Sequence, residues 1–468
     1  MDDLNTIFDK SRTAGEIITS LKEKSVLVPD WSKLREDYFP ELHRIVHDHS
    51  MRRDKVRSDG NIDKASRIHI GLERLLAKRT TEFMYAIPVK RIYHNIAGNE
   101  TRQQIAQAIE RIYKTARIDA ENIRRGNAYF SACEAFTLWY AEEKPNTLYG
   151  FNSQYKLKCR TFSPMDGVRL YPLINERGDM EAMSFEYDRK VMDETVTYFE
   201  AYTANEWRKW EYRAGTWRDV SAAEPVTLGK IPGVYIWRPV PVWHGLSHIR
   251  EEIEYTLSRN SDVIAYNSAP VLKVVGRLFG AEDKGESQRI IRVEENGDVA
   301  YVSWTQAIEA LKYHVDTLLK LFFMQGQMPD LSFDNMKSLG NIGFDARQMV
   351  LSDAHLKIGD ESGPVLEFLD RECNVIRAFL KQMNTAWANE IDALDIEHVI
   401  TPFIQNDEDG VTDRLIKQNG GKAIKSQLET IQEIGSPNPQ ATLEQIQKEE
   451  ASSSQGRISS LFSGEPTM

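Results

Sequence analysis

The stretch SHIREEIEYTLSRNSDVIAYNSAPVLKVVG, residues 247–276, begins as a long polar helix and ends as a short β run. Ile249, Ile253 and Leu257 step by four along one helical face, while charged and polar side chains fill the rest. Pro270 ends the helix, because the residue before a proline is pushed toward extended backbone. The apolar stripe is narrow, so this helix needs neighbours to bury enough surface.

A second helix follows the β run. Between the two helices, VLKVVG (271–276) and RIIRVEENGDVAYVSW (289–304) predict strands, and ENGD has the composition of a hairpin turn. The later helix carries apolar residues at i, i+3 and i+4 spacing, namely Ile308, Leu311, Val315, Leu318, Leu319 and Phe322. We therefore expect two antiparallel helices, 246–268 and 304–325, that hold a small β module, 269–303.

The chain before residue 246 divides into a helical part and a β-rich part. Residues 31–145 read as helices, with Gly126 as an expected helix stop. Residues 147–240 alternate apolar and polar side chains around turn signals, which predicts antiparallel strands. Four aromatic residues of this part could stack on bases or pack within the sheet, and packing is favoured: Trp207, Trp210, Tyr212 and Trp217.

A long helix is predicted from Val365 to about Glu390, after a short helix and the sequence GDESGP (359–364), which we expect to interrupt it. Its apolar residues are spaced 3, 4, 3, 4 like a heptad seam, namely Leu366, Leu369, Cys373, Ile376, Leu380, Met383 and Trp387. A second apolar row runs beside this seam. Such a helix needs contacts on two faces, either inside one large chain or between copies in a ring.

Composition indicates a globular protein of two or more packed units. The chain has 468 residues, of which 41% are hydrophobic. No apolar stretch or leader-like N-terminus points to a membrane or to secretion. Cys133, Cys159 and Cys373 are widely spaced, which favours reduced thiols over disulfides or zinc.

The net charge of −11 is unevenly distributed. Residues 51–125 hold 17 Lys and Arg against 9 Asp and Glu, which gives +8 and leaves −19 for the other residues. This basic stretch could bind nucleic acid or an acidic partner, although solvated helix faces explain it more simply.

Motifs for catalysis are missing from the sequence: no phosphate-binding loop, dinucleotide fingerprint, zinc-protease helix or serine elbow occurs. His43 and His47 in HRIVHDH could share a metal ion, but no third ligand is evident and an exposed helix face is favoured. The carboxylate runs at 251–254 and 407–409 could bind Mg²⁺ in a nuclease, but they read as polar faces and turns. We expect no enzyme activity, no metal and no cofactor.

The order of features resembles the bacteriophage portal proteins of tailed siphophage type, over about residues 30–450. Six segments carry the resemblance: RRGNAYFSACEAFTLWYAEE (124–143), RTFSPMDGVRLYP (160–172), IPGVYIWRP (231–239), the opening stretch, FFMQGQMPDLSFDNMKSLGNIGFDARQMVL (322–351) and GGKAIKSQLETIQEIGSPNPQATLEQIQKEE (420–450). Each is degenerate, and their order and spacing are the informative part. The chain departs from the family where the long helix begins, since GNIGFDARQ stands in place of small residues and Ser-Gly.

The resemblance implies an α+β, predominantly α portal fold. Its parts would be an N-terminal segment (1–30), a wing (31–245), a two-helix stem (246–268 and 304–325), a small β clip (269–303), a channel loop (326–342), a long interrupted wing helix (343–395), a helical crown (396–451) and a disordered tail (452–468).

The resemblance also suggests roles for individual residues. Those expected to face DNA are Asn335, Lys337, Lys312, Lys320 and Arg347. Those expected to dock the terminase or the adaptor at the clip are Arg277, Glu282, Asp283 and Lys284. Those expected to pack helices between subunits are Ile308, Leu311, Val315, Leu366, Leu369, Ile376 and Leu380.

The implied function is a homo-oligomeric ring, commonly a dodecamer, at a capsid vertex of the virion, assembled in the host cytoplasm. Its expected partners are double-stranded DNA, the terminase large subunit, the head–tail adaptor, and the major capsid and scaffolding proteins, with no membrane. Two rival classes stay open: a non-catalytic DNA-binding scaffold that uses the basic stretch, and a metal-dependent nuclease.

Overall fold

The computed structural model describes residues 4–9, 11–26, 28–56, 58–267, 271–275, 278–283, 289–293, 298–302, 308–330, 349–403, 415–418, 425–434, 439–440 and 442–449. The chain forms two compact units, Met1–Ser332 with Leu351–Phe403, and Phe333–Val350 with Ile404–Met468. The second unit contains α15 (Gln427–Ile434). All architecture described below belongs to the first unit.

Helices dominate the first 132 residues. They are α1 (Leu4–Ile7), α2 (Ala14–Glu23), α3 (Trp31–Tyr38), α4 (Arg44–His47), α5 (Leu72–Tyr85), α6 (Glu100–Ala116) and α7 (Ile118–Ala132), with short strands β1 (Lys55–Val56), β2 (Ile62–Asp63) and β3 (Lys90–Tyr93) between them. α2 begins with a capping box, in which the Thr13 and Glu16 side chains each accept the other's backbone N–H. The helical part predicted over 31–145 is confirmed as far as Ala132, with the short strands β1, β2 and β3 as exceptions, whereas residues 134–145 belong to the strand β4 (Glu134–Asn146).

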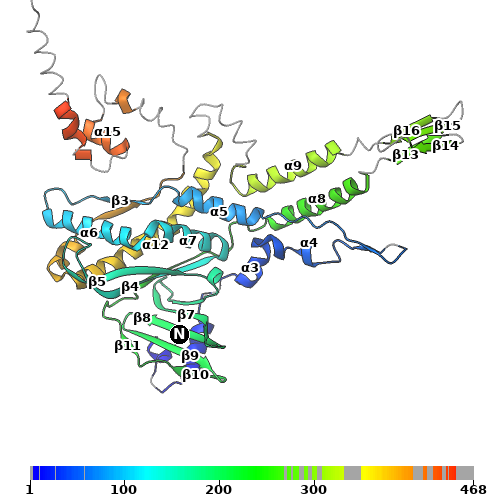
Figure 1. Cartoon of the computed structure of the whole chain (residues 1–468). Coiled ribbons are helices and arrows are strands. Elements are labelled where there is room, and N and C mark those ends of the chain that lie inside the picture. Colours follow the sequence, from blue (N-terminus) through cyan, green and yellow to red (C-terminus); the bar gives the residue numbers. More distant parts are fainter. Residues whose placement is uncertain are drawn as a thin grey trace, which may run out of the picture. The chain divides into compact units, whose positions relative to one another are not determined.

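The β-rich part forms two antiparallel sheets (Figure 1). Its strands are β4 (Glu134–Asn146), β5 (Ser153–Phe162), β6 (Arg169–Ile174), β7 (Met180–Val191), β8 (Glu194–Thr203), β9 (Glu206–Arg213), β10 (Thr216–Asp219), β11 (Glu224–Pro225) and β12 (Gly233–Trp237). One sheet has the order β10-β9-β8-β7-β6, with β11 also on β9, and the other has the order β12-β4-β5. The antiparallel prediction is confirmed.

Apolar side chains on the two faces of these strands contribute to two small hydrophobic cores. On β8, Phe199 and Ala201 pack with Ile17 and Ile18 of α2. On the neighbouring β7, Phe185 packs with aromatic and aliphatic residues of the β12-β4-β5 sheet. The six-stranded sheet is thus covered on one face by α2 and on the other by the second sheet, because successive side chains of a strand point to opposite faces.

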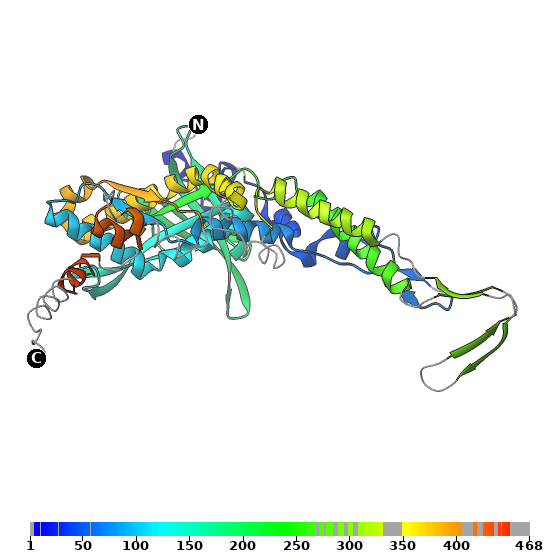
Figure 2. The same ribbon diagram turned by 90° about the horizontal axis from the view of Figure 1, so that it is seen from above.

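The opening stretch forms α8 (Ser247–Asn267), and the later helix is α9 (Ile308–Gln325). The two helices contact each other and run side by side (Figures 1 and 2). Both helix predictions are confirmed within a few residues.

The strands between α8 and α9 pair differently from the prediction. They are β13 (Val271–Val275), β14 (Leu278–Asp283), β15 (Arg289–Val293) and β16 (Asp298–Val302). β13 pairs with β16, and β14 pairs with β15, so the two pairs are nested. The predicted hairpin across ENGD is wrong, because β14, which the sequence analysis missed, supplies the partner of β15.

The long helix is α12 (Ser352–Met383), followed by α13 (Ala388–Asp392) and β17 (Ile396–Val399). The predicted interruption at GDESGP is wrong, because the helix continues through this sequence with Pro364 inside it. The helix also ends before Trp387. β17 pairs with β3, and residues up to Phe403 belong to the first unit.

Gly126 is not a helix stop. It lies inside α7, whereas α6 ends one residue before Arg117, which adopts a left-handed conformation with φ of 57°. A Cβ atom on Gly126 would lie 2.8 Å from Cε2 of Tyr85 and 2.9 Å from Cγ2 of Thr81. The glycine is needed for the close approach of α7 to α5.

Two further expectations concern thiols and membranes. All three cysteines are free, and Cys133 and Cys373 are buried, as predicted. In the part of the chain that the structure describes, every helix is too short or too polar to cross a lipid bilayer.

Candidate functional site: the anchor of α8

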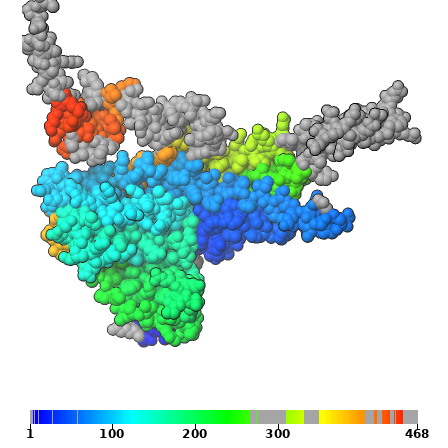
Figure 3. Space-filling view, viewed as in Figure 1, coloured from blue at the N-terminus to red at the C-terminus, as the bar shows by residue number. Residues whose placement is uncertain are grey.

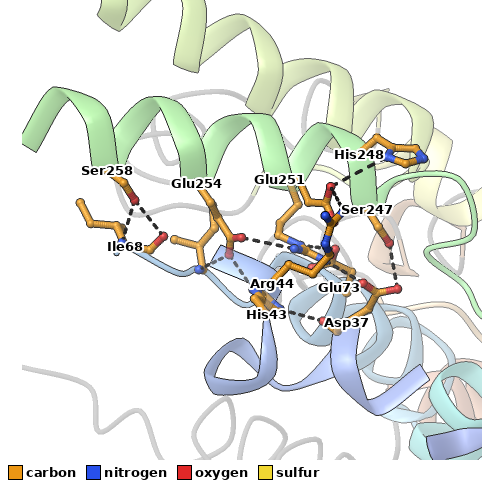
Figure 4. Close-up of polar contacts among 12 residues, drawn as sticks. Asp37, His43, Arg44, Ile68, Glu73, Ser247, His248, Glu251, Glu254 and Ser258 are labelled. Atoms are coloured by element: carbon orange, nitrogen blue, oxygen red, sulfur yellow. Dashed lines mark hydrogen bonds and ion pairs between the residues drawn. The ribbon is translucent and has the colours of Figure 1, made fainter. Parts of the chain in front are cut away.

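A row of four polar residues fixes α8 to the helical part of the unit. Arg250, Glu254, Ser258 and Asp262 follow each other at intervals of four, so they lie on one face of the helix. Every one of them contacts the segment between residues 37 and 73. We call this row and its partners the α8 anchor (Figure 4).

Arg250 is the centre of the anchor. Its Nε donates to Oε1 of Glu73 on α5 at 2.8 Å, and its Nη2 donates to Oδ1 of Asp37 on α3 at 2.7 Å. Its Nη1 donates to Oε2 of Glu254, one helical turn later, at 3.2 Å. One guanidinium therefore binds three carboxylates, two of which come from other helices.

Glu254 collects donors from three segments. Its Oε1 lies 2.5 Å from Nδ1 of His43 and accepts the backbone N–H of Ile70 at 2.9 Å. The other ring nitrogen of His43, Nε2, lies 3.0 Å from the backbone carbonyl oxygen of Asp37. The favoured interpretation of His43 as part of an exposed helix face is wrong, because its ring is turned inward and is 1% exposed.

The row continues toward the far end of α8. Ser258 Oγ accepts the backbone N–H of Ile68 at 2.8 Å, and Asp262 accepts the backbone N–H of Ser66 at 2.9 Å and pairs with Arg52. In the space-filling view, the blue N-terminal segment lies directly against the green helix (Figure 3). The anchor thus runs along four turns of α8.

Burial sets the electrostatics of the anchor. Arg250 is 1% exposed, and Glu73 and Glu254 are fully buried. Burial raises the pKa of Glu73 to about 7, although Arg250 opposes this rise, and Oε2 of Glu73 has no hydrogen-bond partner. Burial alone would lower the pKa of Arg250, but Glu73, Glu254 and Asp37 together raise it. Removing one partner from this network would leave a buried charge that neither water nor another side chain compensates. Such a removal is therefore costly.

Neighbouring carboxylates of α8 do not converge on one point. Glu251 faces Arg44 at 3.8 Å, Glu252 faces His314 of α9 at 3.7 Å, and Glu254 points into the anchor. Among the described residues, no group of three or more His, Cys, Asp or Glu side chains is placed to hold a metal ion. The run at 251–254 therefore does not favour a nuclease, and the run at 407–409 lies outside the described residues.

The end of α9 has an anchor of its own. Lys357 of α12 is buried, and its Nζ donates to the carbonyl oxygen of Gly326 at 2.5 Å, directly after the last residue of α9. A cation at this end complements the helix dipole. Burial lowers the pKa of Lys357 to about 8. The start of α8 and the end of α9 are thus both held by buried charged side chains.

The residues expected to face DNA or to dock partners are only partly described. Lys312 and Lys320 are exposed on α9, and neither forms an ion pair with any residue that the structure describes. Glu282 and Asp283 lie in β14, but their side chains fall outside the described part, as does the side chain of Ile308 at the start of α9. The remaining predicted residues lie wholly outside it: Asn335, Lys337, Arg347, Arg277 and Lys284.

The predicted packing of α12 between subunits needs correction. Leu369, Ile376 and Leu380 are 2%, 0% and 0% exposed within one chain, because α12 packs against β12, α5 and β17. They have no surface left for a second copy. By contrast, Leu366 on α12 and Leu311 and Val315 on α9 are only half-buried, so their predicted contacts with another copy stay open.

Part of the basic stretch is paired with acidic side chains of the same chain. Seven of its arginines form ion pairs with acidic side chains: Arg52, Arg67, Arg79, Arg91, Arg102, Arg124 and Arg125. Arg125 with Glu372 is a buried pair, and Arg102 reaches Glu390. Only Asp262, Glu372 and Glu390 lie outside the stretch, so pairing lowers its balance from +8 to +5, and the rival DNA-binding scaffold stays open. The aromatic residues of β9 and β10 pack within their sheet as predicted, with Trp210 only 1% exposed.

The anchor was missed by the sequence analysis, which assigned no partner to the polar side chains of this helix. A signal for it existed, since the polar row 250–254–258–262 runs parallel to the apolar row 249–253–257, one position further along the helix. The partners Asp37, His43 and Glu73 are over 170 residues away and carry no comparable signal.

Comparisons with known proteins identify a family for this chain. The family model described as "Phage portal protein, SPP1 Gp6-like" matches residues 28–456. A chain from the neck of a native GTA particle, computed with C12 symmetry, is 11% identical, with 90% of this chain and 97% of that chain covered and a TM-score of 0.39. A chain from the neck of an empty GTA particle, computed with C6 symmetry, is also 11% identical, with 78% and 89% covered and a TM-score of 0.38. No curated protein sequence matches this chain significantly.

Proposed function

Because the chain belongs to the SPP1 Gp6-like family of phage portal proteins, we propose that it forms a closed ring at one capsid vertex of the virion, through which double-stranded DNA enters and leaves. The family match over residues 28–456 carries this conclusion. In this proposal α8 and α9 form the stem, residues 269–303 form the clip, residues 326–342 form the channel loop, and residues 396–451 form the crown.

The stem leaves apolar surface uncovered in a single chain, which supports contact with neighbouring copies. Tyr313 is 74% exposed on α9, Met324 is 63% exposed near its end, and Ile264 is 57% exposed near the end of α8. Exposed apolar side chains grouped on one pair of helices are typical of interaction surfaces. A head-to-tail contact that closes by rotation generates a ring, for which we propose twelve copies assembled in the host cytoplasm.

The charge of the assembly suits a channel that conducts DNA without holding it. Twelve chains of −11 give roughly −130 in total, which disfavours tight binding to phosphates. The unpaired Lys312 and Lys320 of the stem would then supply a few weak, sequence-independent contacts, together with Asn335, Lys337 and Arg347. No base-specific recognition is required for this role.

The clip residues Arg277, Glu282, Asp283 and Lys284 are proposed to dock the terminase large subunit during packaging and the head–tail adaptor afterwards. The wing would contact the major capsid and scaffolding proteins. In this scheme the protein acts as a conduit and a docking platform and carries out no reaction.

The proposed channel role can be tested by deleting residues 331–338 from the full-length protein. We expect assembled rings to form as before, while packaging or retention of DNA is impaired. A variant in which the same eight residues are replaced by Gly and Ser controls for loop length. Normal packaging by the deleted protein, or loss of ring formation, would contradict the assignment of this segment as a channel loop.

A further inference from the structure

Both ring nitrogens of His43 face groups that accept hydrogen bonds. Nε2 lies 3.0 Å from the backbone carbonyl oxygen of Asp37, and a carbonyl oxygen can only accept. Nε2 therefore carries a hydrogen. Nδ1 lies 2.5 Å from Oε1 of Glu254. A neutral imidazole has only one N–H, so either Nδ1 carries a second hydrogen or Glu254 is protonated.

In either case, the His43–Glu254 pair holds one proton more than a neutral histidine and a free carboxylate would hold. The other partners of Glu254 favour the carboxylate form, since the backbone N–H of Ile70 and the guanidinium of Arg250 both donate to it. The geometry thus places the extra proton on the ring, as an imidazolium that donates from both nitrogens.

The charges around His43 agree with this assignment. The anchor has three carboxylates, those of Asp37, Glu73 and Glu254, and only one permanent cation, Arg250. A second cation at His43 brings the net charge from −2 to −1, and a protonated Glu73 would bring it to zero. The packed elements carry further charged or titratable groups, among them Arg44 and His47 of α4, Arg74 of α5, and His248 and Glu251 of α8.

We propose that the anchor is a proton-dependent latch, which fixes α8 to the segment 37–73 while the His43–Glu254 pair holds its extra proton. When a higher pH removes this proton, a ring lone pair faces either the Glu254 carboxylate or the Asp37 carbonyl oxygen, and one contact becomes repulsive. The latch is therefore closed at lower pH and loosened at higher pH. Any effect of the latch on the stem of a portal ring rests on the proposed function, but the latch itself does not.

Hydrogen exchange of the full-length protein between pH 6 and 9, corrected for intrinsic exchange rates, tests the latch. We expect peptides covering 247–258 and 68–73 to lose protection as pH rises, by up to about tenfold per pH unit once the proton is lost. Peptides covering 105–113 of α6 serve as an internal reference and should not change. All measurements are made with Glu73→Gln, which removes the second buried carboxyl group that titrates in this range.

Two variants separate the latch from a general effect of pH. His43→Gln removes the ring and should abolish the pH dependence, whereas Glu254→Gln removes the carboxylate that favours the extra proton and should weaken it. His47→Gln is the matched control, because His47 also bonds a backbone carbonyl oxygen, that of Glu41 at 2.8 Å, but is exposed. If His43→Gln unfolds α8 at every pH, the comparison of the parent with Glu254→Gln tests the latch. Protection that is independent of pH in the parent, or equally dependent in the parent and in Glu254→Gln, would overturn the latch.

Discussion

Replacing Arg250 by Met is the perturbation whose cost follows most directly from the structure. The substitution keeps a long side chain in place but removes all three hydrogen bonds that the guanidinium donates. Glu73 and Glu254 are fully buried, so their carboxylates would lose a cation without gaining water. Removing one partner of a buried ion pair costs about 3–5 kcal/mol, and we expect Arg250→Met to destabilise the first unit by this amount.

Equilibrium unfolding of the full-length protein in urea at pH 7 measures this cost. Arg259→Met is the matched control, because Arg259 lies on the same helix, is exposed and forms no ion pair with any described residue. We expect the control to change the free energy of unfolding by less than about 0.5 kcal/mol. Hydrogen exchange should place the loss in residues 247–258 and not in α6.

A second measurement distinguishes lost charge from lost packing. Adding Glu73→Gln and Glu254→Gln to Arg250→Met removes the uncompensated charges, so the triple variant should regain part of the stability. A loss of under about 1 kcal/mol for Arg250→Met, or a triple variant less stable than the single one, would refute the assigned role of the anchor.

Three further predictions concern other parts of the first unit. Gly126→Ala should destabilise the protein by about 1–3 kcal/mol in urea unfolding, because the new Cβ would lie 2.8 Å from the Tyr85 ring. Gly359→Ala, where no atom lies within 4 Å of the new Cβ, should instead stabilise α12 by about 0.5–1 kcal/mol, and equal effects of the two substitutions would contradict the tight approach of α5 and α7. Burial raises the pKa of Glu73 and of Glu134 from 4.5 to about 7, so the folded state binds more protons than the unfolded state between these pH values. The free energy of unfolding should therefore fall as pH rises from 4.5 to 7, by at most about 3 kcal/mol per residue. Glu134→Gln should flatten this pH profile, and a rise in stability over the same range would contradict the assignment. Lys312→Glu with Lys320→Glu should impair DNA packaging while changing stability by less than about 0.5 kcal/mol, and Lys230→Glu, at an equally exposed site away from the stem, should package normally.

The sequence predicted the positions of helices and strands better than it predicted which of them pack or pair together. The period of four in 249–257 and the proline at 270 were enough to place α8, because both signals are local. Pro364 misled the prediction for α12, since burial of Ile358 before it and of Val365 and Phe368 after it stabilises the helix beyond what one proline costs. Gly126 misled in the same way, because close packing and helix termination both select glycine.

The site depends on contacts that periodicity cannot identify. The heptad seam of α12 correctly indicates a buried face, but a 3–4 spacing is the same whether that face meets its own sheet or another copy. The strand β12 and the helix α5 cover the buried face of α12 within the chain. The anchor likewise joins Asp37, His43 and Glu73 to α8 across more than 170 residues, a pairing that only the fold determines.

Direct imaging of the purified full-length protein by electron microscopy tests the central proposal. The account predicts closed annular particles whose open bore is wide enough for a DNA duplex, with α8 and α9 of adjacent copies in lateral contact. A uniform population of isolated chains, or open filaments without a bore, would contradict it.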